Sequence, residues 1–199
     1  NWKWELGANA TAYKNKITAL PDGDYTTTIY GANVLTSVGR AAGVFYGYET
    51  DGVYATQQEA EEAGLTLVST TGEVTPFAAG DMKFVDHVQD GIINEKDMVV
   101  IGNPNPDVYG NLYSNLSYKR LSLNMNFNYS FGNDIYNYQR SQLESGSQFF
   151  NQTTALNRRW IAEGHHTDIP KATFGDPMGN SRFSDRWIED GSYIRLKDI

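Results

Sequence analysis

Residues 121–131 constrain the fold more than any other stretch of this chain. Leucine, methionine, phenylalanine or tyrosine occupies every odd position, and serine or asparagine occupies every even position. Side chains alternate between the two faces of a β-strand, whereas a helix would scatter both classes around its circumference. The stretch therefore predicts a strand with one wholly apolar face and one polar face that carries no charge.

An uncharged polar face is typical of a strand that crosses a bilayer. About 9 to 11 tilted residues span the membrane in such strands, with apolar side chains towards lipid and polar ones towards a wet lumen. Phe127, Tyr129 and Phe131 crowd one end, where an aromatic girdle would lie. A soluble sheet with one buried face gives the same alternation, so the pattern alone leaves both interpretations open.

Residues 107–118 supply an antiparallel partner for this strand. One of its faces carries Val108, Leu112 and Leu116, and the other carries Tyr109, Asn111, Tyr113 and Asn115. Lys119 and Arg120 form a tight connection between the two strands. The alternation also predicts a strand over residues 1–18, a second strand with a break over 25–38, and the start of a further strand over 191–199.

Composition excludes several classes of function. The net charge of −8 makes nucleic acid an unexpected partner. The chain has no cysteine, which removes disulfides, zinc–thiolate sites and thiol catalysis. No nucleophile–base pair or phosphate loop is present, so we do not expect an enzyme. The sequence starts and stops inside alternating patterns, and we therefore expect a fragment of a longer chain.

Residues 49–97 hold 11 acidic and two basic residues. This charge predicts an aqueous excursion and not part of a membrane wall. Thr56, Glu59 and Gly64 have the spacing of an N-cap, a capping box and a C-terminal glycine, so a short helix is expected over 56–64. A second, amphipathic helix is expected over 148–160.

Within the acidic segment, residues 86–97 have the spacing of a calcium loop. The candidate ligands are Asp86, Asp90, Ile92 through its carbonyl, Asn94 and Asp97, with Gly91 at the sharp turn. Val88 stands at the third position and cannot ligate, which argues for weak binding. The alternative is a loop that keeps this shape through hydrogen bonds alone.

Several motifs occur together in a distinctive order. They are Phe45-Tyr46-Gly47-Tyr48, Val100-Ile101-Gly102-Asn103-Pro104-Asn105-Pro106, Gly132-Asn133-Asp134, Thr167-Asp168-Ile169-Pro170 and Ser184-Asp185-Arg186-Trp187-Ile188-Glu189-Asp190-Gly191-Ser192-Tyr193. In this order and spacing the chain resembles the C-terminal part of the SusC/RagA family, the TonB-linked outer-membrane transporters of Bacteroidetes. The resemblance covers most of the chain and is strongest over residues 80–199.

The resemblance implies a mainly β fold, an antiparallel meander within a 22-stranded outer-membrane barrel. It implies nutrient uptake at the bacterial outer membrane, with a SusD-like surface lipoprotein, the TonB complex acting through an N-terminal part, and glycan or oligopeptide cargo. No cofactor is required, and calcium is the one candidate. The family's calcium-like loop usually has Asn or Asp where Val88 stands, and its substrate contacts lie in variable loops that cannot be carried over.

On this interpretation the chain divides into five segments. They are barrel strands (1–48), an acidic extracellular excursion with the short helix and calcium-like loop (49–106), a barrel hairpin (107–131), a second excursion with a helix (132–190) and the start of a further barrel strand (191–199). The competing hypothesis is a soluble, calcium-dependent binding module of β-sandwich type. It would bury the apolar strand faces against a second sheet.

Overall fold

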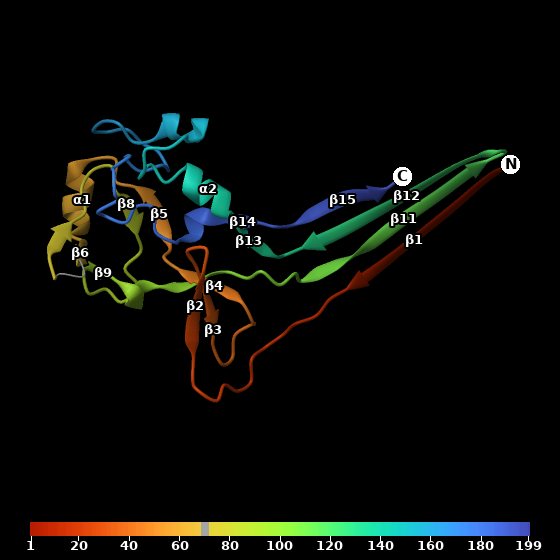
Figure 1. Cartoon of the computed structure of the whole chain (residues 1–199), viewed down its shortest axis with the longest axis horizontal. Coiled ribbons are helices and arrows are strands. Elements are labelled where there is room, and N and C mark those ends of the chain that lie inside the picture. Colours follow the sequence, from red (N-terminus) through yellow and green to blue (C-terminus); the bar gives the residue numbers. More distant parts are fainter. Residues whose placement is uncertain (69–71) are drawn as a thin grey trace.

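The computed structural model describes residues 1–68 and 72–199, and these form a long sheet joined at one end to a compact body (Figure 1). We call the two parts the wall sheet and the outer body. The wall sheet has four antiparallel strands in the order β1-β11-β12-β15. Their bounds are β1 Trp2–Thr11, β11 Val108–Tyr118, β12 Leu121–Phe131 and β15 Tyr193–Asp198.

The predicted hairpin is confirmed. β11 and β12 pair along their whole length, from Val108 opposite Phe131 to Tyr118 opposite Leu121. Lys119 adopts a left-handed φ of 54° in the turn between them. β15 pairs with the other edge of β12, as the strand expected over 191–199 requires.

β1 is shorter than the strand predicted over residues 1–18. It ends at Thr11, after which the chain leaves the sheet and runs to the outer body. There the backbone of Ile17 exchanges hydrogen bonds with Arg40 and Gly39, each 2.9 Å long. These backbone groups find their partners in the outer body, so the strand does not continue.

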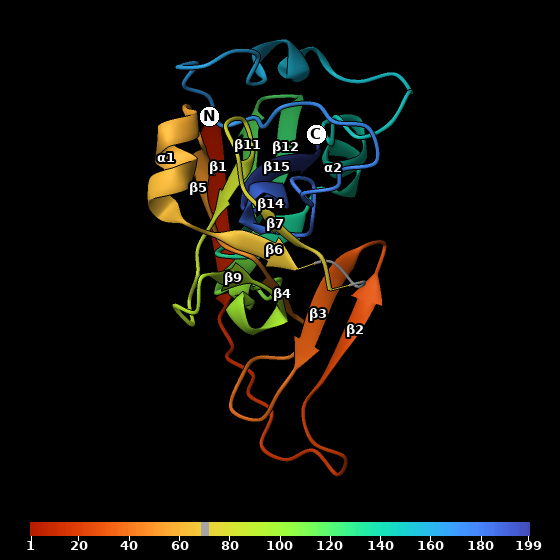
Figure 2. The same ribbon diagram turned by 90° about the vertical axis from the view of Figure 1, so that its left-hand side faces the viewer.

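A second sheet has the order β10-β4-β3-β2. Its strands are β2 Tyr25–Ile29, β3 Ala32–Thr36, β4 Val44–Gly47 and β10 Val99–Gly102. The prediction of one interrupted strand over 25–38 is wrong: two strands form a hairpin, which projects from the rest of the molecule (Figure 2). The segment 1–48 is therefore divided between the two sheets, and only β1 belongs to the wall sheet.

Short elements complete the outer body. The strands are β5 Thr50–Val53, β6 Thr66–Val68, β7 Val74–Pro76, β8 Met82–Phe84, β9 Ile92–Ile93, β13 Asp134–Tyr136 and β14 Ile188–Asp190. The helices are α1 Gln57–Ala63, α2 Tyr138–Leu143 and the 3-10 turns η1 Glu95–Asp97, η2 Thr154–Arg158 and η3 Asp185–Trp187. Within the described residues, no helix is long and apolar enough to span a membrane.

The helix expected over 56–64 is confirmed by its caps. The Thr56 hydroxyl accepts a hydrogen bond from the Glu59 amide, and Gly64 is left-handed with a φ of 64°. The helix expected over 148–160 is wrong in extent, because only η2 forms there. Phe149, which an amphipathic helix would bury, is 90% exposed.

The two excursions share one hydrophobic core. Val53, Met82, Phe84 and Ile93 come from the first excursion, and Met178 comes from the second. Trp160 of the second excursion packs against them, and its indole Nε1 donates to the carbonyl of Ala55 (3.0 Å). The excursions therefore fold as a single body and not as two separate loops.

Candidate functional site

One face of the wall sheet is apolar across all four strands. Two of its rows are Trp4–Leu116–Leu123 and Ala8–Leu112–Phe127–Leu196. These side chains stay open to the surroundings: Trp4 is 65% exposed, Leu121 74% and Ile194 67%. A contiguous exposed apolar surface marks a region that faces lipid or another protein.

Aromatic side chains lie at both ends of this face. At the hairpin end, Trp2 stacks on Tyr118 with ring centroids 4.3 Å apart. At the other end, Tyr129 and Phe131 lie 5.6 Å apart. The length of β12 is about 33 Å at ~3.3 Å per residue, and a tilt of about 40° reduces this to about 25 Å, the height of the apolar band of an outer-membrane barrel.

The opposite face is lined by amides. Asn9, Asn111 and Asn128 form one row across three strands. The Asn111 backbone N–H donates to Asn9 Oδ1 (3.1 Å), and its side-chain Nδ2 donates to Asn128 Oδ1 (2.9 Å) and also to Asn126 Oδ1. The absence of charge predicted for β12 extends over this row, whereas charged residues lie on β1 and β15 at the two edges of the sheet.

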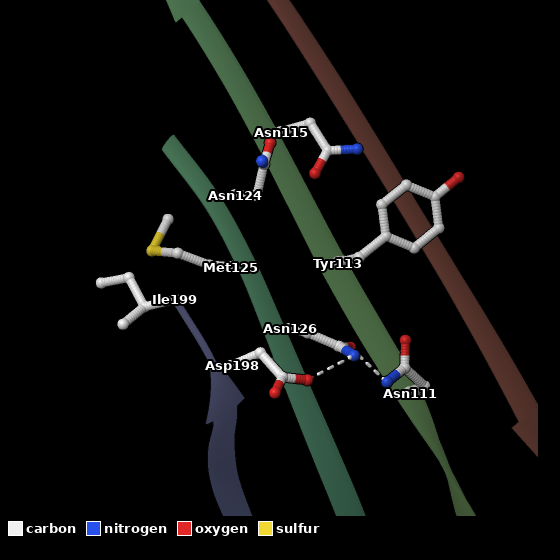
Figure 3. A pocket seen from close by; sticks show the side chains of 8 residues that line it. All are labelled: Asn111, Tyr113, Asn115, Asn124, Met125, Asn126, Asp198 and Ile199. Carbon is white, nitrogen blue, oxygen red and sulfur yellow. Dashed lines mark hydrogen bonds between the residues drawn. The ribbon is translucent and has the colours of Figure 1, made fainter. Parts of the chain in front are cut away.

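A concavity of about 470 Å³ lies on this polar face (Figure 3). Its lining includes Asn115, Asn124 and Asn126, and Asp198 closes one side, with the Asn126 amide 3.5 Å from its carboxylate. The surface offers both donors and acceptors, and Asp198 at its edge is the one charged side chain among the described residues that line it. It therefore suits hydrogen-bonding groups of a neutral molecule or of another polypeptide segment.

Two glycines let tyrosine rings cross the sheet, one on each face. Tyr129 passes over Gly110, and its hydroxyl donates to the Asn9 carbonyl (2.9 Å). On the polar face, Tyr113 lies over Gly7, its direct partner on β1 (Figure 3). A Cβ at Gly110 would collide with the Asn9 carbonyl as well as with the ring, so this position requires glycine, whereas a Cβ at Gly7 would meet only the Tyr113 ring, which can move.

The predicted calcium-loop residues lie together in the outer body, but their oxygens are used within the loop. Desolvation acts to raise the pKa of the Asp86 carboxyl, yet hydrogen bonds from the Gly91 and Gln89 amides outweigh it and hold that pKa below its usual value. Asp97 is fully buried and accepts from the amides of Val88 (3.2 Å) and Asn94 (2.9 Å).

The remaining candidate ligands are also engaged. Asp90 accepts from the Ile92 amide (3.0 Å), and the Ile92 carbonyl accepts from the Asn94 side chain (3.1 Å). Within residues 1–68 and 72–199, no three His, Cys, Asp or Glu side chains are grouped so that they could hold a metal ion. The loop's own hydrogen bonds account for its shape, and calcium binding stays a prediction.

Calorimetric titration of calcium tests that prediction. We expect a dissociation constant of about 10⁻⁴ to 10⁻³ M for the wild type, tighter binding for Val88→Asn, and none for Asp90→Ala. Asp51→Ala removes an exposed carboxylate outside the loop and is the control. Micromolar binding by the wild type would show that the valine is tolerated, and no gain in Val88→Asn would show that the cation geometry is absent.

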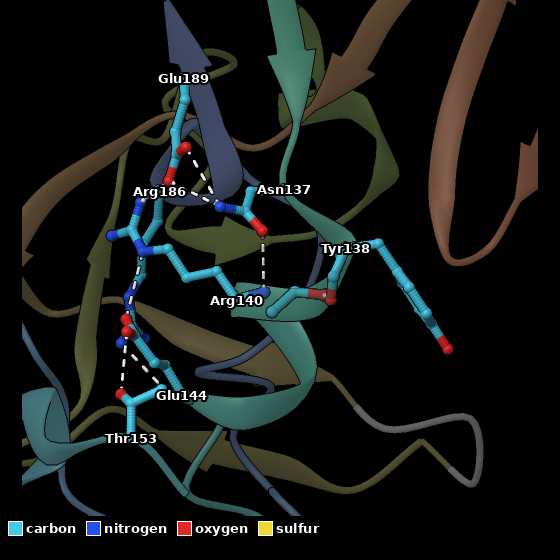
Figure 4. A network of polar contacts seen from close by, with 8 residues as sticks. Asn137, Tyr138, Arg140, Glu144, Thr153, Arg186 and Glu189 are labelled. Atoms are coloured by element: carbon cyan, nitrogen blue, oxygen red, sulfur yellow. Dashed lines mark hydrogen bonds and ion pairs between the residues drawn. The ribbon is translucent and has the colours of Figure 1, made fainter.

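Two arginines of the second excursion, Arg140 and Arg186, pack against Trp187. Trp187 is fully buried, and the Arg186 guanidinium lies 4.3 Å from its ring. Burial, and secondarily the nearby Arg140, lowers the pKa of Arg186 to about 10. Arg140 in turn pairs with Glu144 (3.1 Å) and Glu189 (2.9 Å), which joins α2 to β14 (Figure 4). These stacked groups are a structural network.

Sequence reasoning missed the hairpin-end aromatic cluster, because Trp2 and Tyr118 meet only through the β1–β11 pairing. The sequence did offer one signal for this cluster, because Trp2 and Trp4 lie in the same alternating segment. It also missed the pairing of the Asn103 and Asp134 motifs. The Asn103 amide donates to Asp134 Oδ2 (2.7 Å), and the Asp134 amide donates to the Asn103 carbonyl (2.8 Å), where the wall sheet meets the outer body.

Comparison with known proteins gives three related sequences. TonB-dependent receptor P26 of Formosa agariphila is 30% identical over 204 residues, and TonB-dependent receptor P3 of the same organism is 32% identical over 206 residues. Both alignments cover the whole chain. The chain spans only about a fifth of the length of these relatives, 20% and 19%. No protein-family model matches the chain.

Solved structures show the same fold. The RagAB peptide transporter superposes with a TM-score of 0.73 over 98% of this chain and 20% of that one, at 21% identity. The RagAB peptide importer in its "closed-closed" state gives a TM-score of 0.68 with the same coverage. At this identity the likeness establishes the mainly β, antiparallel architecture predicted from the sequence.

Proposed function

This chain is a relative of the TonB-dependent receptors over its whole length, and from that premise we propose that it forms part of the wall and the outer surface of an outer-membrane importer. β1, the hairpin 107–131 and residues 191–199 are assigned to the barrel wall. Residues 49–106 and 132–190, together with the β2–β3 hairpin, are assigned to the extracellular side. The relatives are receptors and transporters, not enzymes.

One observation carries this proposal: the wall sheet is apolar and exposed on one face and amide-lined on the other. Side chains such as Trp4, Leu121 and Ile194 would be costly to expose in water over such an area. Lipid removes that cost on one side, and a wet lumen hydrates the asparagines on the other. The same sheet would be unstable by itself in water.

The soluble β-sandwich alternative has less support. A sandwich needs a second sheet packed face to face, about 10 Å away. The outer body instead lies beyond the end of the wall sheet, and the described residues place no second layer over the apolar face (Figure 1). The oxygens of the loop 86–97 are also already engaged in hydrogen bonds within the loop, which gives a calcium-dependent module no added support.

Partners and cargo belong to the same proposal: the relatives' names support TonB dependence and peptide transport, and the resemblance of the sequence to the SusC/RagA family supports the lipoprotein and the glycan. The TonB complex would supply energy through a part of the protein outside this chain, and a SusD-like lipoprotein would cover the extracellular side. Cargo is a glycan or an oligopeptide. The net charge of −8 and the uncharged amide row give no surface suited to nucleic acid.

Uptake by cells that carry the intact receptor tests the proposal. We expect uptake of the cargo to fall to background when TonB is deleted, because the wall itself contains no energy source. Restoring TonB on a plasmid is the matched control. Uptake that persists without TonB, with the receptor still present in the outer membrane, would refute the assignment as a TonB-dependent importer.

A further inference from the structure

We propose that a pocket in the outer body binds one unit of a neutral saccharide. Its volume is about 290 Å³, and it lies where the β2–β3 turn, α2 and the loop before η3 meet. Its lining includes Tyr30, Ser141, Gln142, Ser147, Gln148 and Phe150. We call it the Tyr30 pocket. A volume at the low end for small-molecule sites admits one sugar ring, with neighbouring units outside.

The Tyr30 pocket has a single charged side chain among its described lining residues. None of the described residues that line it is a carboxylate, and Arg182 is its one charged residue. The Arg182 guanidinium is already committed: Nε donates to the Gly179 carbonyl (2.9 Å) and Nη2 to the Met178 carbonyl (3.0 Å). It also lies over the rings of Tyr48 and Phe84. A cationic ligand would lose its hydration here and find no carboxylate, and an anionic one would meet only a guanidinium that is already engaged by two carbonyls.

Hydroxyls and amides give the pocket many hydrogen-bonding groups. The Ser147 hydroxyl donates to Ser145 Oγ (3.0 Å), and the Ser141 hydroxyl donates to the Tyr138 carbonyl (2.8 Å), which leaves lone pairs on both serines to accept from a ligand. The side-chain amides of Gln142 and Gln148 make no hydrogen bond to any described residue. A purely apolar ligand would leave these groups unpaired.

Tyr30 sits at the rim in a strained conformation. With a φ of 49° followed by 82° at Gly31, the turn has two left-handed residues, a geometry that favours asparagine and glycine. A bulky residue at positive φ is unusual and strained. The Tyr136 hydroxyl holds the Tyr30 carbonyl (3.2 Å), and the Tyr30 ring is 76% exposed. The turn thus presents an aromatic face beside a polar pocket.

These features together select a ligand that is neutral, rich in hydroxyls and apolar on one face. A sugar ring has all three properties, because its axial C–H groups can stack on Tyr30 while its hydroxyls reach the serines and glutamines. The biological meaning of this site, outer capture of cargo, rests on the proposed transport function. Binding at the site does not depend on transport.

An oligosaccharide array tests the Tyr30 pocket with the intact receptor purified in detergent. The array carries neutral oligosaccharides, oligouronates and uncharged tetrapeptides. We expect the wild type to bind neutral oligosaccharides, and Tyr30→Asn and Gln142→Ala each to weaken that binding by about tenfold, which corresponds to ~1.4 kcal/mol. Tyr30→Asn suits the turn, so its thermal midpoint should not fall below that of the wild type.

Tyr25→Ala, at the end of β2 far from the turn, and Gln58→Ala, on α1, are the matched controls and should bind as the wild type does. Wild-type binding to oligouronates or peptides alone, or to nothing on the array, would overturn the proposal. Unchanged binding in both pocket variants would also overturn it. The array needs neither membrane nor TonB, so TonB-independent uptake would refute the transport assignment while leaving this result intact.

Discussion

Replacing Asp81 with alanine is expected to destabilise the outer body by about 3–5 kcal/mol. The Asp81 carboxylate is 1% exposed and accepts hydrogen bonds from the Ala78 amide (2.9 Å) and from Asn180 Nδ2 (2.9 Å). It also pairs with Lys171 Nζ (3.1 Å). Asn180 and Lys171 belong to the second excursion, so the loss of one side chain leaves donors of both excursions without their acceptor.

Urea unfolding, followed by tryptophan fluorescence, measures this cost, because Trp160 packs against the shared core. The Lys171 side chain is 29% exposed and can regain water, which places the expected value towards the lower end of the range. Asp51→Ala, at an exposed carboxylate of the same excursion, is the control and should change stability by less than about 0.5 kcal/mol. A cost below 1 kcal/mol for Asp81→Ala would show that the apolar core alone joins the two excursions.

Leu123→Arg is expected to cost about 2–4 kcal/mol in the bilayer, whereas Asn124→Arg should cost far less. The two residues are neighbours on β12 and point to opposite faces of the wall sheet. An arginine at 123 would place a guanidinium in lipid, and one at 124 would reach the wet lumen. Folding of the intact receptor into lipid vesicles, measured by urea titration, gives both values.

Cysteine substitution tests which face of the wall sheet each position lies on, without adding a charge to the strand. The chain has no cysteine, so Leu123→Cys and Asn124→Cys each introduce one thiol into it. A charged, water-soluble thiol reagent should modify position 124 and not position 123 in membranes. Equal costs for the two arginines, or equal labelling of the two cysteines, would argue for a sheet with both faces in water.

Much of the wall sheet can be predicted from the sequence, because its signal is local. The alternation over residues 121–131 has a period of two, and that period by itself decides which side chains share a face. The capping residues Thr56, Glu59 and Gly64 predict α1 for the same reason, since each cap acts within one helical turn. The weak periodicity of residues 148–160 led to a wrong prediction of a helix. Only a 3-10 turn forms there, and Phe149 is exposed and not packed on a helix face.

The sequence by itself therefore determined the strands of the wall sheet and their faces, the acidic outer segment and the resemblance to TonB-linked transporters. The tertiary structure alone decided that Trp2 meets Tyr118, that Asp81 joins Asn180 and Lys171, and that Tyr30 meets α2. The physical reason is distance along the chain. These partners are about 100 residues apart, so their contacts depend on strand register and core packing, which leave no periodic pattern in either partner's own neighbourhood.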